Sequence, residues 1–150
     1  MTHADDVTWM ERAIELSRMC PPAEGAFSVG AIIVGADGTE LANGYSRETD
    51  AHVHAEESAL AKLPTDDPRL VGATLYSTLE PCSERKSRPL TCTQLILRSP
   101  IRRVVIAWRE PSLLVADCVG VETLRATSVE VLELPHLAEA ARFVNLHLLE

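Results

Sequence analysis

Residues 72–108, GATLYSTLEPCSERKSRPLTCTQLILRSPIRRVVIAW, hold one complete strand–helix–strand unit. GATLYSTL (72–79) and RRVVIAW (102–108) are short runs of apolar and β-branched residues, which are typical of buried strands. TCTQLILRS (91–99) lies between them and has the composition of a short helix, for which Thr91 is a suitable N-cap. A helix that joins two successive strands places them parallel in one sheet, so the unit predicts an α/β fold.

The rest of the chain continues the alternation of helices and strands. Two strands separated by the turn-forming residues ADG predict a hairpin, and Thr8 and Glu11 have the spacing of a capping box at the start of the first helix. The predicted helices cover residues 8–19, 54–63, 91–99, around 116–127 and 137–149, and the predicted strands cover 27–35, 40–46, 72–79, 102–108 and 128–134. This order predicts a single domain over residues 1–150, a three-layer α/β/α sandwich with a mixed five-stranded sheet.

The composition is that of a globular protein and argues against several classes of partner. Hydrophobic residues make up 46% of the 150 residues and charged residues 24%. No apolar run approaches the roughly 18 residues that cross a membrane, and the acidic N-terminus lacks the apolar core of a secretory signal, so we expect a cytoplasmic protein without a membrane partner. A net charge of −8 and an aromatic content of 4% argue against nucleic acid as a partner.

Four cysteines are too few for a disulfide scaffold, and in a reducing compartment spaced cysteines more often bind metal or take part in catalysis. Cys82 follows a predicted strand, Cys92 begins the next predicted helix, and His54 opens an earlier one. The two cysteines alone could be ligands of one metal, a disulfide or two core thiols. Together with His54 they are a known catalytic zinc set, which leaves a fourth position for water, and helix starts stabilise thiolates. Glu56 would then move a proton of that water.

Two short motifs connect these residues to a known family. HAE (54–56) and TLEPC (78–82) match the H-x-E…P-C arrangement of the zinc-dependent nucleobase deaminases. With these motifs and its order of elements, the chain resembles the cytidine deaminase-like family over nearly its whole length. GYSRE (44–48), TLEPCSER (78–85) and REP (109–111) are similar to the riboflavin-biosynthesis pyrimidine deaminases, which also have a long spacer between the two cysteines.

The resemblance implies a hydrolytic deaminase with one zinc ion per subunit. His54, Cys82 and Cys92 would be the zinc ligands, and Glu56 would shuttle protons. The substrate would be an aminated pyrimidine-type heterocycle, most specifically a riboflavin-precursor diaminopyrimidinone phosphate, and ammonia would be released. Because members of this family assemble as dimers or larger homo-oligomers, a homo-oligomer is expected as well.

The nine residues between the two cysteines, 83–91, are predicted to form a loop over the pocket, called the ligand loop below. Three basic residues and one acidic residue give this loop a charge of +2, which suits a phosphate on the substrate. Phe27 is predicted to stack on the substrate ring. The predicted substrate contacts are Phe27, Ser46, Glu48, Ser83, Arg85, Lys86 and Arg88.

Other functions remain open on these residues. The same chemistry would serve a deaminase of a free base or nucleoside, such as cytosine, cytidine, guanine or a triazine. A tRNA- or DNA-editing deaminase needs a basic stripe with stacking aromatic residues, and a non-catalytic zinc-binding module would not need Glu56. Cys20 and Cys118 are predicted to pack in the core rather than to supply a fourth ligand, and Glu80 to brace its turn through backbone hydrogen bonds.

Overall fold

The computed structural model describes residues 2–111 and 118–149. Its elements are α1 (His3–Ser17), β1 (Gly30–Val34), β2 (Glu40–Tyr45), α2 (Ala55–Ala61), the 3₁₀ helix η1 (Pro68–Leu70), β3 (Thr74–Leu79), α3 (Cys92–Arg98), β4 (Arg103–Trp108), α4 (Gly120–Ala126), β5 (Glu130–Glu133), the 3₁₀ helix η2 (Pro135–Leu137), α5 (Ala138–Phe143) and α6 (Leu146–Leu149). The predicted helix around 116–127 therefore starts in part outside the described residues, and its described portion is α4. No helix in these two ranges is long and apolar enough to cross a bilayer.

The five strands form one mixed sheet in the order β2-β1-β3-β4-β5. β1 pairs antiparallel with both β2 and β3, whereas β3–β4 and β4–β5 are parallel pairs. The hairpin between β1 and β2 turns at Gly38, whose φ of 85° is a conformation that glycine adopts without strain. Both the hairpin and the parallel unit that the sequence predicts are thus confirmed.

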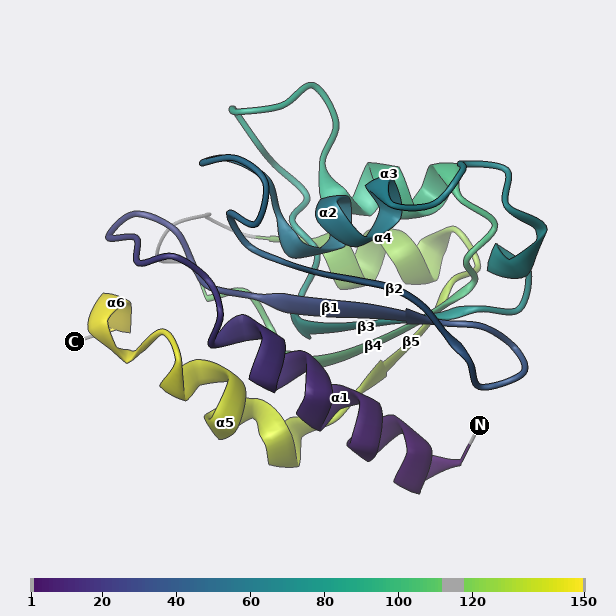
Figure 1. The fold of residues 1–150 in the computed structure, drawn as a ribbon, viewed down its shortest axis with the longest axis horizontal. Helices are drawn as coiled ribbons and strands as arrows, with labels where there is room; N and C mark the ends of the chain where they lie inside the picture. The colour runs from purple at the N-terminus through teal and green to yellow at the C-terminus, as the bar shows by residue number, and fades with distance from the viewer. Residues whose placement is uncertain (1, 112–117, 150) are drawn as a thin grey trace.

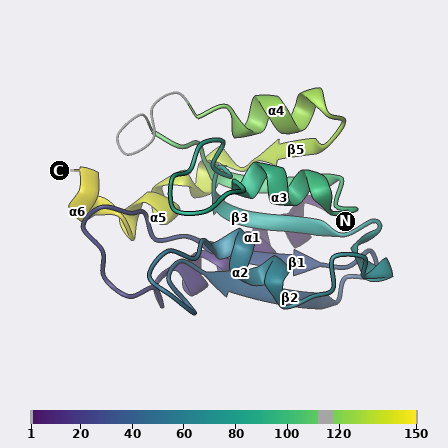
Figure 2. The ribbon, with the colours of Figure 1, turned by 90° about the horizontal axis from the view of Figure 1, so that it is seen from above.

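Helices cover both faces of this sheet, as Figure 1 shows, with α1 and α5 on one face and α2, α3 and α4 on the other. Seen from above in Figure 2, α2, α3 and α4 lie next to one another across the sheet. Successive residues of a strand point to opposite faces, so Leu75 packs under α2 and α3 while Tyr76 packs under α1. The predicted three-layer sandwich with a five-stranded sheet is confirmed.

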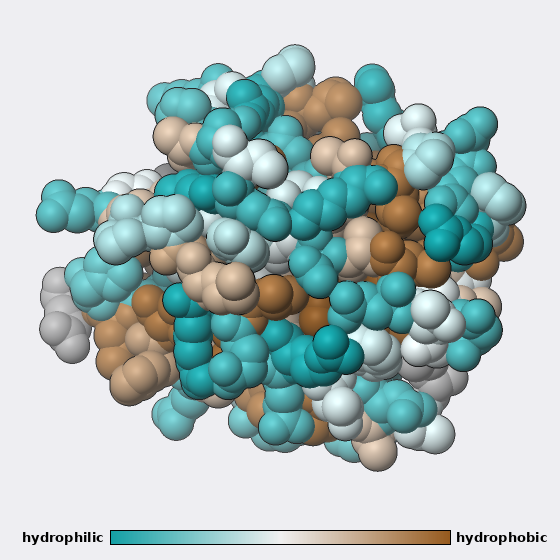
Figure 3. Space-filling view, viewed as in Figure 1, coloured by the Kyte–Doolittle hydropathy of each residue, from teal (hydrophilic) through white to brown (hydrophobic). Residues whose placement is uncertain are grey.

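Hydrophobic and hydrophilic side chains are interspersed on the face shown in Figure 3. Large apolar side chains are exposed at separate places along the chain, namely Met19, Val71, Val119, Phe143 and Leu146. Such scattered exposure is ordinary for a globular protein.

The first helix begins earlier than predicted. Thr2 is its N-cap: the Thr2 hydroxyl accepts a hydrogen bond from Asp5 N at 3.2 Å, and Asp5 Oδ2 accepts one from Thr2 N at 3.1 Å. Thr8 lies inside the helix, where its hydroxyl donates to the carbonyl of Ala4 at 3.0 Å. The prediction of a capping box at Thr8 is therefore wrong, because an aspartate at the N3 position serves the same purpose six residues earlier.

The predicted C-terminal helix over 137–149 is divided into η2, α5 and α6. The break between α5 and α6 falls at Asn145, which is buried. Its side chain accepts a hydrogen bond from Ser28 N at 2.6 Å and donates one to Ser28 O at 3.1 Å. This contact, to a residue far away in the sequence, fixes the segment before β1 and interrupts the helix.

Candidate zinc site

The three predicted metal ligands come from element ends that meet beyond the carboxyl end of β3, the central strand of the sheet. His54 is the N-cap of α2, Cys82 lies just after β3, and Cys92 is the first residue of α3. The start of α2 packs closely on β2 at Gly44, where a Cβ atom would lie only 2.6 Å from the carbonyl oxygen of Ala55. Glycine at this position therefore allows the helix to bring His54 to the end of the strands where the two cysteines lie.

The ligand atoms lie at hydrogen-bond-like distances from one another. His54 Nδ1 is 3.6 Å from Cys82 Sγ and 3.4 Å from Cys92 Sγ. All three atoms lie within 4.8 Å of one another, and no other histidine, cysteine or carboxylate group of three or more is so arranged within residues 2–111 and 118–149. Both cysteines are buried free thiols, so the disulfide alternative does not apply.

The chemistry of these donors fits a zinc ion. A nitrogen and two sulfurs are a donor set that zinc takes in proteins, and the sulfurs must bind as thiolates. The hydrogen bond from the Cys92 thiol lowers the pKa of Cys82 to about 4 against the opposing effect of burial, and His54 and the Cys92 N–H, 3.3 Å from Cys82 Sγ, contribute. The site thus stabilises negative charge on one sulfur, Cys82, whereas the hydrogen bond to Cys82 and burial raise the pKa of Cys92, so that a bound cation is needed to hold both sulfurs as thiolates.

Glu56 lies beside these ligands on the first turn of α2 and is buried. Burial raises the pKa of Glu56 to about 7, and the neighbouring His54 opposes this shift while negative charge at Cys82 adds to it. A carboxyl with a pKa near neutrality can both accept and donate a proton under ordinary conditions, which is what general acid–base chemistry requires.

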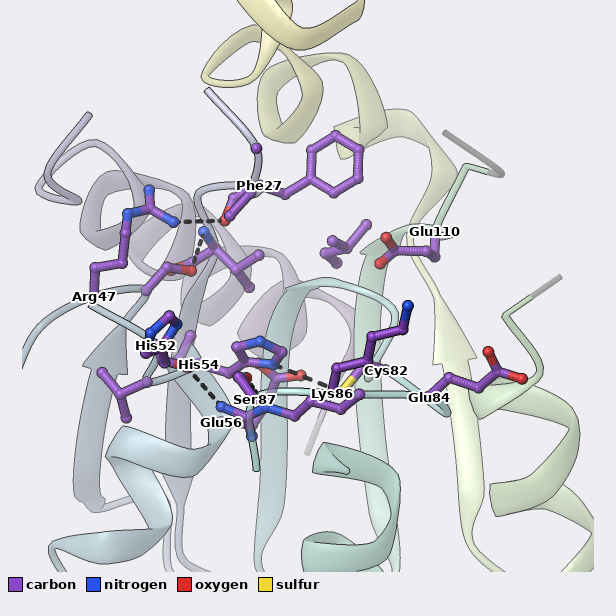
Figure 4. Close-up of a pocket in the computed structure, with 18 of the residues that line it drawn as sticks. Phe27, Arg47, His52, His54, Glu56, Cys82, Glu84, Lys86, Ser87 and Glu110 are labelled. Carbon is purple, nitrogen blue, oxygen red and sulfur yellow. Dashed lines mark hydrogen bonds between the residues drawn. The ribbon is translucent and has the colours of Figure 1, made fainter. Parts of the chain in front are cut away.

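A cavity of about 340 Å³ opens beside His54, Glu56 and Cys82. This volume suits a small heterocycle with a substituent. Figure 4 shows Phe27 at its upper wall and the ligand loop at its lower wall. The ring of Phe27 packs edge-on against Trp108, with centroids 5.3 Å apart, so the aromatic wall is held in place from behind.

Four of the predicted substrate contacts line this cavity, namely Phe27, Ser46, Arg85 and Lys86. The side chain of Ser46 is fixed there, because its hydroxyl oxygen accepts a hydrogen bond from Val29 N at 2.9 Å.

The other three predicted contacts are not among the described residues that line the cavity. Glu48 accepts hydrogen bonds from Ser58 and Lys62 at 2.6 and 2.9 Å. Ser83 accepts one from Val119 N at 3.0 Å, and Arg88 makes ion pairs with Asp50 and Glu57. Each of these side chains is thus engaged elsewhere.

Several residues at the cavity wall were not among the predicted contacts, Glu110 and Arg47 among them. The Glu110 carboxylate extends into the cavity in Figure 4 and has no hydrogen-bond partner in the described part of the chain. Burial and the negative charges at Cys82, Glu56 and Glu80 raise its pKa to about 8. Arg47 has a φ of 61° and donates to Phe27 O at 3.2 Å. Both residues lie in quoted motifs, Glu110 in REP (109–111) and Arg47 in GYSRE (44–48), but no pattern indicated that they would line the cavity.

Glu80, Cys20 and Cys118 are not zinc ligands in this structure. Glu80 accepts hydrogen bonds from Glu110 N at 3.0 Å and Val121 N at 2.9 Å, so the prediction that it braces its turn is confirmed. Cys20 and Cys118 lie outside the ligand group, as predicted. They are only half-buried, however, so the prediction that they pack in the core is wrong. The sulfur of Cys20 lies near the carbonyl oxygen of Val29, and the sulfur of Cys118 lies near that of Pro81.

Comparisons with known proteins agree with this geometry. Residues 3–108 match the family described as the cytidine and deoxycytidylate deaminase zinc-binding region. The chain is 41% identical over 129 residues to the diaminohydroxyphosphoribosylamino-pyrimidine deaminase of Schizosaccharomyces pombe, covering 83% of this chain and 31% of that protein. It is 34% identical over 114 residues to the protein of the same name from Buchnera aphidicola, covering 72% and 70%.

The fold has close counterparts among solved structures. The Rib2 deaminase of Aspergillus oryzae superposes with a TM-score of 0.81 at 24% identity, covering 93% of this chain and 89% of that one. The chain spans about a third of the length of the S. pombe relative. It belongs to the cytidine and deoxycytidylate deaminase zinc-binding family, and His54, Cys82 and Cys92 form the zinc site typical of that family.

Proposed function

We propose that residues 1–150 form one zinc-dependent deaminase domain that hydrolyses an aminated pyrimidine, specifically a diaminopyrimidinone phosphate of riboflavin biosynthesis. One observation carries this proposal: the buried Glu56 carboxyl stands two residues from a zinc ligand at the wall of a ring-sized cavity. The names of the S. pombe and Buchnera relatives supply the class of substrate.

The reaction replaces a ring C–NH2 group by C=O, consuming one water and releasing one ammonia. Zinc, when held by His54, Cys82 and Cys92, supplies the Lewis acidity that makes water nucleophilic near neutral pH. Glu56 takes up one proton of the attacking water and delivers it to the ring nitrogen, and it then takes up the second proton of that water and delivers it to the departing amino group. Its raised pKa serves both directions of transfer, since neither protonation state is strongly disfavoured near pH 7.

Different residues of the cavity wall are expected to contact the ring and the phosphate of the substrate. Phe27, Val29 and Leu79 give a flat heterocycle an apolar surface. Lys86 lines the cavity and is, in the described residues of the ligand loop, the basic side chain that has no ion pair. We therefore assign the phosphate of the substrate to Lys86 rather than to Arg85 or Arg88.

Ammonia release by the zinc-loaded protein tests the proposal. The panel pairs phosphorylated diaminopyrimidinones, including DARIPP, the ligand of the A. oryzae Rib2 deaminase, with cytosine, cytidine, deoxycytidylate and guanine. Turnover of the phosphorylated diaminopyrimidinones with little on the other compounds is the expected result. Turnover of free bases or nucleosides alone would keep the zinc chemistry and overturn the substrate assignment.

Two further measurements accompany this assay. Metal analysis is expected to give one zinc per chain. Light scattering is expected to give a homodimer or a larger homo-oligomer, as the family resemblance implies. A monomer with full activity would contradict the oligomer without affecting the deaminase assignment.

A further inference from the structure

Two segments supply the zinc ligands, and an arginine joins them. The segment before and into α2 carries His54 and Glu56, and the ligand loop connects Cys82 to Cys92. From the loop, Arg85 Nη2 donates to the carbonyl oxygen of His52 at 2.7 Å and to Glu57 Oε1 at 2.7 Å. The loop is thus fastened to the residues on either side of the histidine ligand.

The Glu57 carboxylate is the centre of this connection. Its Oε1 also accepts a hydrogen bond from His54 N at 3.1 Å, which closes the capping box at the start of α2. Its Oε2 lies 3.3 Å from Nε of Arg88, the second arginine of the loop. One carboxylate therefore orders the backbone of a zinc ligand and holds the loop between the other two.

Two of the ion pairs of the loop, Arg85–Glu57 and Arg88–Asp50, differ in their exposure to water. The side chain of Arg85 is 2% exposed and that of Glu57 is 22% exposed, whereas Arg88 and Asp50, 2.5 Å apart, are 32% and 49% exposed. A shielded pair interacts more strongly than a solvated one and is harmed more by loss of one partner. The Arg85 side chain is buried although its Nη1 has no hydrogen-bond partner among the described residues. We attribute its buried position to the contact between its Nη2 and Glu57.

We propose that Glu57 is a positioning residue of the zinc site, whose carboxylate locks the ligand loop onto the start of α2 through Arg85. The lock sets the spacing of His54 relative to the two cysteines. Because Arg85 and Lys86 also line the cavity, it fixes the cavity wall as well. The inference rests on the zinc site and adds to the proposed function a residue that touches neither metal nor substrate.

Glu57→Gln tests the lock, because glutamine keeps an oxygen that can accept from His54 N while the charge that holds Arg85 is lost. The matched control is Asp50→Asn, which removes the exposed ion pair between Asp50 and Arg88 of the same loop.

Both variants are loaded with Co²⁺, whose visible absorption reports ligand geometry, and metal affinity is measured by competition with a chelator. We expect Glu57→Gln to shift the absorption bands and weaken binding about 10- to 100-fold, as loss of partners outside the ligand set does elsewhere. Asp50→Asn should change affinity less than about twofold.

A double variant separates the lock from a general loss of stability. If Arg85 and Glu57 act as one unit, Arg85→Met alone should reproduce the cobalt spectrum of Glu57→Gln, and the double variant should be no worse than either. Arg85→Met also serves as the test if Glu57→Gln does not fold.

Unchanged cobalt spectra and affinity in whichever of these variants fold would overturn the proposal, even if their melting temperatures fall. So would additive losses in the double variant. These readouts need no substrate, so a failure of the ammonia-release panel would leave this inference standing, and its failure would leave the panel intact.

Discussion

Two buried carboxyl groups of this molecule have opposite properties. Asp6 on α1 is 1% exposed and Glu56 on α2 is 4% exposed. Asp6 accepts hydrogen bonds from Tyr76 Oη at 2.6 Å and from Arg103 Nη2 at 2.7 Å, and against the opposing effect of burial these partners lower its pKa. No cation among the described residues is hydrogen-bonded to Glu56; burial raises its pKa to about 7, and the charges of His54 and Arg85 oppose this only in part. Burial alone thus does not decide the state of a carboxyl, because the partner does.

The two groups also lie at opposite ends of the parallel strands. Arg103 is the first residue of β4, and it reaches Asp6 and Thr74, the first residue of β3. The zinc ligands collect where β3 ends, beyond the carboxyl end of the strand, which is where α/β sheets commonly place their binding sites. At one end the buried Asp6 carboxylate is paired with Arg103 and stabilises the fold, while the other end keeps groups available for chemistry.

Of the substitutions at the two ends of the strands, removal of a zinc ligand is expected to have the largest effect, on zinc affinity and on turnover. Cys92→Ser should weaken zinc binding by more than about 100-fold, since even outer partners of metal ligands cost 10- to 100-fold, and ammonia release should fall below detection. Cys118→Ser is the matched control, because Cys118 lies outside the ligand group. Metal analysis and turnover check both. A Cys92→Ser protein that holds one zinc per chain and turns over would contradict the assigned ligand set.

At the opposite end, Asp6→Asn should lower stability and leave chemistry intact. The substitution leaves the Arg103 guanidinium without its buried partner, and loss of one member of such a pair costs about 3 kcal/mol. Urea unfolding measures this loss, and turnover per folded molecule at 25 °C should match the unsubstituted chain. Glu11→Gln, on the exposed side of the same helix, should change stability by less than about 0.5 kcal/mol. Equal stability of Asp6→Asn and Glu11→Gln would remove the stabilising role given to Asp6.

The stabilisation by Asp6 should depend on pH in a definite direction. Its pKa in the folded chain lies below the usual value of 3.8, so its contribution is fully present above that value and is lost as pH falls through the folded pKa. The stability difference between the unsubstituted chain and Asp6→Asn should therefore be constant from pH 7 to about 5 and shrink below 3.8. A difference that stayed constant into strong acid would show that Asp6 does not act through its charge.

Glu110→Gln is expected to have the smallest effect and the opposite sign. Because burial raises the pKa of Glu110 from 4.5 to about 8, its ionisation opposes folding progressively between these two pH values. The variant should melt at a higher temperature than the unsubstituted chain by roughly 2–4 °C at pH 8, the shift that about 1 kcal/mol gives in a chain of this size, and by much less at pH 5. Thermal melts at both pH values measure it. A variant that melts lower at pH 8 would mean that Glu110 has a stabilising partner.

Local patterns made most of the fold predictable. The β-branched run at 102–108, the turn residues after β1 and the capping residue Thr91 each act within a few residues, and the structure has the corresponding elements. The zinc ligands were predictable because HAE and TLEPC place them at helix and strand ends, which the fold then brings together.

What could not be predicted depends on contacts between distant residues. Asn145 breaks the last helix by bonding to Ser28, 117 positions away in the sequence. Arg85 lines the cavity, but its Nη2 also donates to Glu57, 28 positions away, and no local pattern encodes that pairing. Charge in a loop indicates which residues can bind an anion, and only the three-dimensional arrangement shows which of them are already paired.

Glu56→Gln tests most directly the claim that the unpaired buried carboxyl performs the chemistry. Zinc content, melting temperature and ammonia release would be measured together on the unsubstituted chain and the variant. We predict one zinc per chain in both, an equal or higher melting temperature in the variant, and a kcat lowered about 10²- to 10⁴-fold, the usual contribution of a positioned acid–base group. A variant that retains zinc and deaminates within about tenfold of the unsubstituted chain would contradict the account.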